Sequence, residues 1–262
     1  MATVVQSDNR SVSGVQRKPA DTGVVVHALH KSASMFLFSF FQRLSMRAGL
    51  EYFSVNLPDG RPLPAGFHGK YCHCPIRTFA IEEDESSESG VTRIFQVRDP
   101  RDILVSEYYS VAYIHPVNDE SLKKRRVEAQ KMTVEEYAIR QPEFSASPLE
   151  QKFQPLLDRL ENTRESGVDC NDILVRYETM VSRFHEWASA VIVPFGFQFP
   201  RIMAAKLAWE YRKDFVPPAE GDSMTHKRRI TPGDFRRKFS PETIEILNER
   251  FAPILEAFGY SR

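Results

Sequence analysis

The sequence has 262 residues and a mass of 30.2 kDa, enough for one large domain or two small ones. Lysine plus arginine and aspartate plus glutamate number 35 each, so the net charge excludes a global field that would attract nucleic acid, and any anion site must be local. Three cysteines make no disulfide framework, which favours a reducing compartment, and we expect the cytoplasm. The sequence contains no stretch of 18 apolar residues without a charge, so we predict no membrane span. Residues 1–20 lack the apolar core of a secretory signal, and we expect them to form a flexible tail.

The first structured stretch runs from Val24 to Phe41. Its run of three valines predicts a buried parallel strand, and an apolar, helix-compatible run covers about 34–48. Lys31, Ser32 and Ser34 lie between the two. A strand that leads into a helix N-terminus offers free backbone N–H groups and the positive end of the helix dipole, which together favour an anion. This stretch alone fits equally well a phosphate- or sulfate-binding turn and an ordinary connection with a solvated lysine.

The same arrangement returns further along the chain. A loop rich in proline and glycine at 56–66 and a short extended piece at 68–75 come first, and an acidic loop covers 82–90. Residues 92–97 then predict a second strand, which ends at R-D-P-R-D (98–102) before a helix that starts near 103. Two strand–turn–helix units predict parallel strands with ligand groups at their carboxyl ends.

The second half of the chain adds surface helices within 119–166 and a third buried strand at 172–176. Helices are predicted at about 181–193, 200–213 and 241–258, with a basic, Pro/Gly-rich stretch at 216–238. No linker separates two apolar cores. We therefore predict one α/β domain over 21–262, with a central parallel sheet flanked by helices and a P-loop-like strand–loop–helix.

Four motifs in order resemble the sulfotransferases that use 3′-phosphoadenosine-5′-phosphosulfate (PAPS). They are K-S-A-S at 31–34, R-D-P-R-D-I-L-V-S at 98–106, R-Y-E at 176–178 and R-R-I-T-P-G-D-F at 228–235. The resemblance spans about 24–240. It implies in-line transfer of a sulfuryl group from PAPS to a hydroxyl or amine of a small-molecule or lipid-like acceptor, without a metal ion.

The resemblance also implies roles for individual residues. Lys31 would stabilise the transfer, His73 would be the base, and Ser106 would assist at the 3′-phosphate with Arg98, from which it lies eight residues away. Phe36 matches a position that stacks on adenine, and Tyr177 one that supports the cofactor loop. The implied cofactor-binding set is Lys31, Ser32, Ala33, Ser34, Met35, Phe36, Arg98, Ser106, Tyr177, Arg228 and Arg229.

The base is the least settled of these assignments. His73 matches the family's H-x-P segment, and a near-neutral pKa suits the task. His27, His30 and His68 are rivals, because each lies close in sequence to an anion-site strand end. The cluster Cys72-His73-Cys74 would alternatively suit a metal ion, although no second ligand pair at finger-like spacing accompanies it.

Several positions depart from the family pattern. Ala33 and Ile230 replace glycines, and a tight turn with left-handed backbone would resist an alanine at 33. Met35 replaces a threonine, Phe235 a tryptophan and His30 a proline. These changes indicate a divergent branch and remove no charged group that the reaction requires.

Two other functions stay open from the residues. An ATP-dependent P-loop kinase predicts G-x-x-x-x-G-K-[ST], and no glycine lies in the segment just before Lys31. A non-catalytic nucleotide-binding relative would keep the cofactor site without turnover. The sequence names neither the acceptor nor the oligomeric state, for which a homodimer is one alternative.

Overall fold

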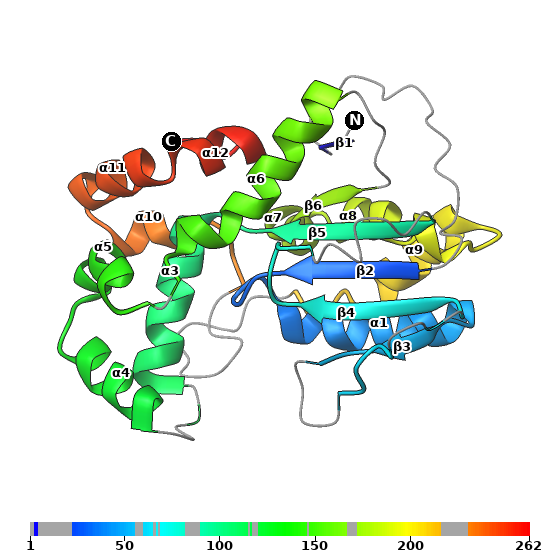
Figure 1. Ribbon diagram of the computed structural model, residues 1–262, viewed down its shortest axis with the longest axis horizontal. Coiled ribbons are helices and arrows are strands. Elements are labelled where there is room, and N and C mark those ends of the chain that lie inside the picture. Colours follow the sequence, from blue (N-terminus) through cyan, green and yellow to red (C-terminus); the bar gives the residue numbers. More distant parts are fainter. Residues whose placement is uncertain are drawn as a thin grey trace. The chain divides into compact units, whose positions relative to one another are not determined.

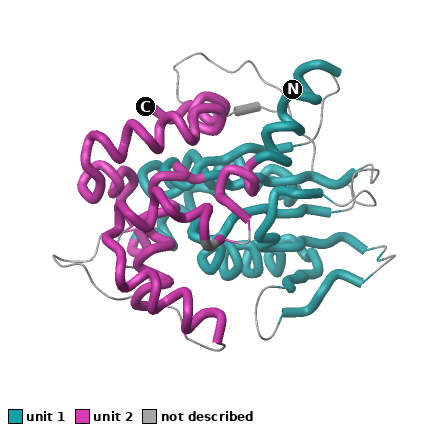
Figure 2. The backbone as a smooth tube through the Cα atoms, turned by 60° about the vertical axis from the view of Figure 1, so that its left-hand side comes forward, with its two compact units in different colours: residues 1–97, 154–212 teal, residues 98–153, 213–262 magenta. Residues whose placement is uncertain are grey.

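The computed structural model describes residues 3–4, 23–55, 60–64, 67, 69–81, 90–114, 116, 120–145, 147–166, 172–215 and 230–262. The chain divides into two compact units, residues 1–97 with 154–212 and residues 98–153 with 213–262 (Figure 2). Each unit takes two stretches of chain, and each is described by itself. The single domain over 21–262 stays a prediction.

Among the described residues of the first unit, six parallel strands form one sheet, in the order β1-β6-β5-β2-β4-β3 (Figure 1). This confirms the predicted parallel sheet flanked by helices. The extended piece that holds His73 is itself a strand. Two residues of the expected N-terminal tail, Thr3 and Val4, pair with β6. The strands are β1 (Thr3–Val4), β2 (Gly23–Ala28), β3 (Glu51–Phe53), β4 (Tyr71–Ile76), β5 (Val91–Val97) and β6 (Ile173–Arg176).

Helix α1 (Ser34–Ala48) packs on β4 and β3 and carries the apolar stripe that the sequence predicted. Leu37, Phe40, Phe41 and Leu44 recur at helical spacing and are all buried. Phe40 lies 5.0 Å, ring centre to ring centre, from Trp187 of α8 (Phe184–Val191). The stripe therefore joins α1 and α8 in one aromatic core, and the helix ends at a left-handed residue, Gly49.

The remaining helices of the first unit follow β6. Helix α7 (Tyr177–Ser182) starts directly after the strand, so the helix predicted from 181 begins earlier and is interrupted at Arg183. A 3₁₀ turn η2 (Val193–Phe195) and helix α9 (Pro200–Glu210) come next. Helix α6 (Leu149–Ser166) spans the boundary between the units, and its Arg159 forms an ion pair with Asp172, just ahead of β6.

The second unit is helical. Its members are α3 (Pro100–Tyr109) with a π-helical continuation η1 (Ser110–Ile114), α4 (Glu120–Gln130), α5 (Val134–Phe144), α10 (Phe235–Lys238), α11 (Pro241–Arg250) and α12 (Ala252–Phe258). Asp99 caps α3 by accepting from the Arg101 N–H at 3.0 Å, with Pro100 in the first turn. Thr133 and Glu136 form a capping box at α5. Among the helices described here, none has the length and apolar character needed to cross a membrane.

Candidate functional site

The turn between β2 and α1 holds two residues in left-handed backbone conformation. Lys31 has φ 70° and Ala33 has φ 66°, and Ala33 is the N-cap of α1. A residue other than glycine in this region costs about 1–3 kcal/mol and persists only where its surroundings impose it. Residue 33 is an alanine, yet its backbone adopts the conformation that glycine would favour. Strain of this kind clusters at ligand-binding and catalytic sites.

Ser32 lies between these two residues and is fully buried. Its Oγ has no hydrogen-bond partner among the described residues, which is rare for a buried hydroxyl. Its backbone N–H donates to the Leu29 carbonyl at 3.1 Å. Its carbonyl accepts from Gln96 Nε2 at 2.6 Å, and Gln96 Oε1 accepts from Trp187 Nε1 at 3.0 Å. The turn is thus held from β5 and α8, and one hydroxyl remains available to a ligand.

The sequence motifs did not indicate Gln96. Its signal in the sequence is a neutral polar residue near the end of a strand that is mostly β-branched and apolar and also contains Arg93. A buried amide must satisfy both a donor and an acceptor, so such a residue marks a point where the strand reaches out to another element.

The N-terminus of α1 presents backbone N–H groups with a positive dipole end. The first intrahelical bond runs from Leu37 N to Ala33 O at 3.0 Å, so the N–H groups ahead of it have no helical acceptor. No acidic residue lies in the first turn and no side chain caps it. Ser34 is buried, whereas Met35 is 59% exposed. The end of a 15-residue helix can therefore bind an anion.

Phe36 belongs to the aromatic core. Its ring lies 5.5 Å from that of Tyr211 and 5.7 Å from that of Phe40, measured between centroids, and it also contacts Phe184 and Trp187. The side chain is only partly buried. These contacts fix the orientation of Phe36 from the protein side and leave part of the ring accessible.

His73 lies in β4, next to β2, with Val25 as its partner in the ladder. The side chain is 8% exposed, and neither ring nitrogen has a hydrogen-bond partner in the described part of the chain. Burial lowers the pKa of His73 below its ordinary value, because the charged imidazolium is desolvated. The imidazole is therefore neutral at pH 7 and able to accept a proton.

The alternation of β4 argues against a metal ion on Cys72, His73 and Cys74. Neighbouring residues of a strand point to opposite faces of the sheet, so the thiols of Cys72 and Cys74 project from one face and the imidazole of His73 projects from the other. Burial raises the pKa of Cys72 to about 12, although a hydrogen bond with Ser45 opposes the rise. Within the described ranges, no three His, Cys, Asp or Glu side chains are grouped to hold a metal ion.

The rival histidines differ sharply in environment. His27 is fully buried, its Nδ1 lies 2.8 Å from the Thr78 carbonyl, and its ring stacks on Phe95 at 4.9 Å. Burial lowers the pKa of His27 to about 4. His30 is exposed in the turn, and His68 lies outside the described residues.

In the second unit, Arg98 directly follows β5 and is mostly buried. Asp102 lies one helical turn later, and its carboxylate accepts from the backbone N–H groups of Gly233 at 2.7 Å and Phe235 at 3.0 Å. Burial raises the pKa of Asp102, and the charge of Arg98 opposes that rise. Asp102 thus fastens the end of the basic segment to α3, near Arg98. In the sequence, Asp102 stood out only as the last residue of the R-D-P-R-D motif.

Ser106 lies on α3 and is half-buried. Arg228 and Arg229, which the motif places upstream of Gly233, lie outside the described residues. Tyr177 is buried at the first position of α7. The predicted residues therefore fall into two groups: the turn at 31–36, His73 and Tyr177 in the first unit, and Arg98 and Ser106 in the second.

Arg101 is structural. Its guanidinium is fully buried and bonds both oxygens of Asp99, at 3.0 and 2.7 Å, together with Asn248 Oδ1 at 2.6 Å and the Ser261 carbonyl at 2.8 Å. The same guanidinium lies 4.1 Å from the ring centroid of Phe235. The second arginine of the R-D-P-R-D motif thus ties α3 to α11 and to the C-terminal residues.

The fold of this chain is similar to that of known proteins, although its sequence is not. No protein-family model matches the sequence, and no curated protein matches it. Among solved structures, mouse sulfotransferase SULT7A1 complexed with PAP matches with a TM-score of 0.54 and 11% identity, over 90% of this chain and 86% of that one. Retinol dehydratase in a complex with retinol and PAP matches with a TM-score of 0.51 and 13% identity, over 91% and 82%. The chain has a sulfotransferase-like α/β fold.

Proposed function

We propose that the protein is a PAPS-dependent sulfotransferase that transfers a sulfuryl group to a hydroxyl or amine of a small-molecule or lipid-like acceptor. The observation that carries the proposal is the strained turn at 31–33 with the buried, unpartnered hydroxyl of Ser32, set at the N-terminus of α1. The fold supports it, because the turn occupies the strand–loop–helix of a fold shared with two PAP-bound proteins.

The residues of this turn fit a phosphosulfate group. The backbone N–H groups at the start of α1 can only donate hydrogen bonds, and the hydroxyls of Ser32 and Ser34 can also donate them. Such donors match a phosphosulfate group, whose oxygens only accept. Lys31 adds a compact ammonium suited to charge that develops on the leaving oxygen. When bound, PAPS supplies the sulfuryl group. The protein's share is positioning and charge stabilisation, as in phosphoryl transfer.

His73 is our candidate for the base that takes the acceptor proton. Its burial keeps the imidazole neutral at pH 7. Its ring nitrogens make no hydrogen bond that would stabilise the fold, which supports a functional role for this side chain. His27 is a poorer candidate, because one of its ring nitrogens is committed to the Thr78 carbonyl.

The second unit supplies the proposed 3′-phosphate contacts. Arg98 would offer a bidentate guanidinium and Ser106 a hydroxyl, with Arg228 and Arg229 completing the set. The link from Asp102 to Gly233 and Phe235 supports this assignment, because it holds the end of the basic segment near Arg98. Tyr177 would support the cofactor loop, and Phe36 would stack on the adenine.

The acceptor class and location are also proposals. One neighbour of this fold was solved with retinol, which supports a small, lipid-like alcohol. We expect the enzyme to work in the cytoplasm and to need no metal ion, since Lys31 and the arginines neutralise the charge.

Calorimetry tests the proposal directly. We expect PAP, the desulfonated product of PAPS, to bind the intact protein, and 5′-AMP, which lacks the 3′-phosphate, to bind much more weakly. Absence of PAP binding would sink the proposal. Tight binding of ADP with magnesium, together with magnesium-dependent turnover, would instead indicate the kinase.

The lysine separates an enzyme from a non-catalytic relative. Lys31→Ala should lower turnover by about 100-fold or more while PAP affinity changes far less, because the ammonium acts on charge that develops during transfer. Lys123→Ala, at an exposed ion pair with Glu120, is the matched control and should leave turnover unchanged. A parent protein that binds PAP but turns over no acceptor would indicate the non-catalytic relative.

A further inference from the structure

Helix α9 exposes large apolar side chains on one side while its other side is buried. Ala204 and Leu207 are buried beneath it, where α9 packs on α8. Ile202 is 67% exposed, Trp209 is 66% exposed, and Phe199, the residue before the helix, is 60% exposed. A surface helix ordinarily turns its apolar side chains to the core and polar ones to solvent, so large apolar side chains on the outer side of α9 indicate a surface that another body covers.

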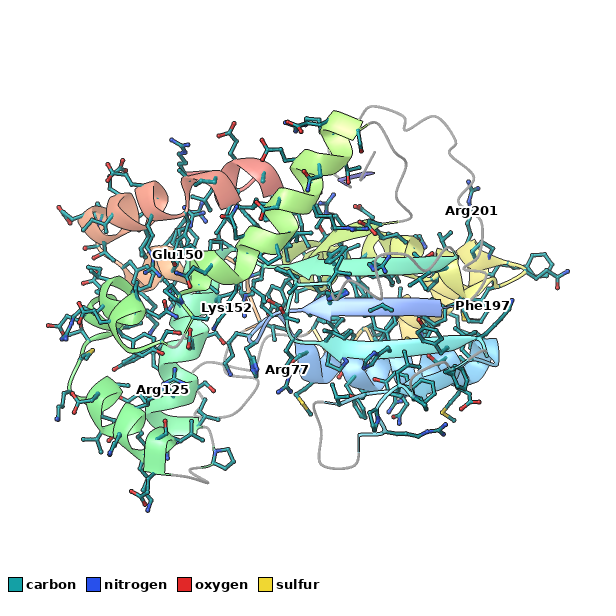
Figure 3. The ribbon with its side chains drawn as sticks, viewed as in Figure 1. Arg77, Arg125, Glu150, Lys152, Phe197 and Arg201 are labelled. Carbon is teal, nitrogen blue, oxygen red and sulfur yellow. The ribbon has the colours of Figure 1, made fainter. Side chains whose placement is uncertain are left out.

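Basic residues flank this apolar stripe. With 3.6 residues per turn, Ile202 and Trp209 lie on the same side of the helix, while Arg201 falls about 90° to one side and Lys206 about 50° to the other. Arg201 and Lys206 are both exposed, and Figure 3 shows Arg201 projecting from the ribbon. Arg212, just after the helix, places its guanidinium 4.1 Å from the ring centroid of Trp209.

The charged side chains of α9 are mostly basic. Glu210 is the one acidic residue of α9, and it is paired with Arg47 of α1 at 2.9 Å. Next to it, Arg43 of α1 lies 6.0 Å from the ring centroid of Tyr211. The surface is therefore locally positive although the chain as a whole is neutral.

We propose that the α9 surface, formed by Phe199, Arg201, Ile202, Lys206, Trp209 and Arg212, docks on a membrane that contains anionic lipid. An apolar centre with Trp, between two basic flanks, matches a helix that lies in the plane of the interface: the apolar side chains enter the acyl boundary and the cations meet headgroup phosphates. The aliphatic parts of Arg and Lys extend the apolar area while their charges reach the headgroups. This inference does not depend on the proposed sulfotransfer.

A second copy of the chain is a less favourable occupant. In a two-fold symmetric contact the same surface faces itself, so the cations of one copy would oppose those of the other across an apolar centre. Anionic lipid provides the complementary charge instead.

Vesicle binding tests the proposal with the full chain. Phosphatidylcholine vesicles with a quarter phosphatidylserine should co-sediment with the protein at low salt, and vesicles of phosphatidylcholine alone should do so much less. The two tryptophans of the chain separate the signal, because Trp187 is 1% exposed and Trp209 is 66% exposed. We expect the emission to shift to shorter wavelength on binding and this shift to disappear in Trp209→Phe.

Two variants and a control decide the assignment. Arg201→Gln with Lys206→Gln should weaken binding to the anionic vesicles by about 30-fold, at about 1 kcal/mol for each cation near the surface. Ile202→Ser with Trp209→Ser should abolish it. Ile246→Ser, on an exposed isoleucine of α11 whose helix neighbours include Glu242 and Glu249, should change nothing.

Three results would overturn the proposal. The first is that the folded parent protein, shown to be folded by its cooperative thermal unfolding, does not bind anionic vesicles at low salt. The second is binding that the α9 variants do not weaken. The third is a dimer in sedimentation that dissociates in the α9 variants, which would assign the surface to a second copy.

Discussion

The side-chain amide of Gln96, near the end of β5, donates from Nε2 to the carbonyl oxygen of Ser32 at 2.6 Å and accepts from the Trp187 indole at 3.0 Å. One buried amide thus joins the strained turn to the strand beside it and to α8. In a turn where Lys31 and Ala33 both have positive φ, this bond is a candidate for the constraint that holds the strain.

Replacement of Gln96 should separate the stability of the turn from that of the core. Gln96→Leu leaves the Ser32 carbonyl and the Trp187 N–H without their partner, at about 1–3 kcal/mol for each group in a denaturant titration. We also expect weaker PAP binding. Trp187→Phe is the control, because it removes the indole bond and part of the ring volume but keeps the bond from Gln96 to Ser32, and it should leave PAP binding closer to the parent. Equal PAP affinity of Gln96→Leu and the parent would contradict the role.

Ala33→Gly should stabilise the protein. Glycine removes about 1–2 kcal/mol of left-handed strain, and the larger conformational entropy of the unfolded chain cancels about 0.4–1 kcal/mol of that gain. A net stabilisation of about 0–1.6 kcal/mol remains. The midpoint of urea unfolding measures it. Ala205→Gly, in the middle of α9, should instead lose about 1 kcal/mol. A loss at both positions would mean that Ala33 is not strained.

His27 should make the protein sensitive to acid. Its pKa is about 4 in the folded protein, against an ordinary 6.5, so the unfolded chain binds more protons between these values. Its contribution is fully present above pH 6.5 and is lost as the pH falls through 4, to the extent of about 3 kcal/mol. Unfolding free energies at pH 7 and pH 4 should differ less by about that amount in His27→Gln. His185→Gln, at an exposed histidine, should retain the parent's difference.

If His73 is the base, its lowered pKa sets the acid limit of turnover. The base works in its neutral form, so kcat/KM should fall with decreasing pH only below 6.5. His73→Asn should lose about 100-fold or more in turnover and keep PAP binding. An acid limb above 6.5, or an unchanged rate in the variant, would assign the base elsewhere.

Arg101→Met should be severely destabilising. It leaves the Asp99 carboxylate buried without its main partner, which costs about 3–5 kcal/mol. Arg140→Met, at an exposed ion pair with Glu143, should cost about 0.5 kcal/mol or less in the same urea titration. A loss at Arg101 no larger than at Arg140 would rule out the structural role.

Much of the fold is written in local patterns. The valine run at 24–26, the strand pattern at 92–97 and the apolar spacing of 37–44 predict strands and a helix that the structure confirms. Strands buried on both faces are rich in β-branched and apolar residues, whereas a helix buried on one face repeats its apolar residues about every 3.6 positions. The order of the four motifs was enough to predict a sulfotransferase-like fold, although the βα turn with its lysine and hydroxyls alone fits an ordinary connection equally well.

Local sequence patterns did not predict the contacts between residues that are far apart in the sequence. Ser32 and Gln96 are 64 positions apart, and Asp102 and Gly233 are 131 apart. No local period records such pairs, because a hydrogen bond depends on which strands become neighbours and on which side each one turns. The same reason explains His27 and His73: both are histidines close to strand ends in the sequence, and only the packing of the first unit decides that one is bound to Thr78 while the other keeps two unpartnered nitrogens. The left-handed backbone at Ala33 belongs to this class as well, since an alanine adopts it only where tertiary contacts outweigh its own preference.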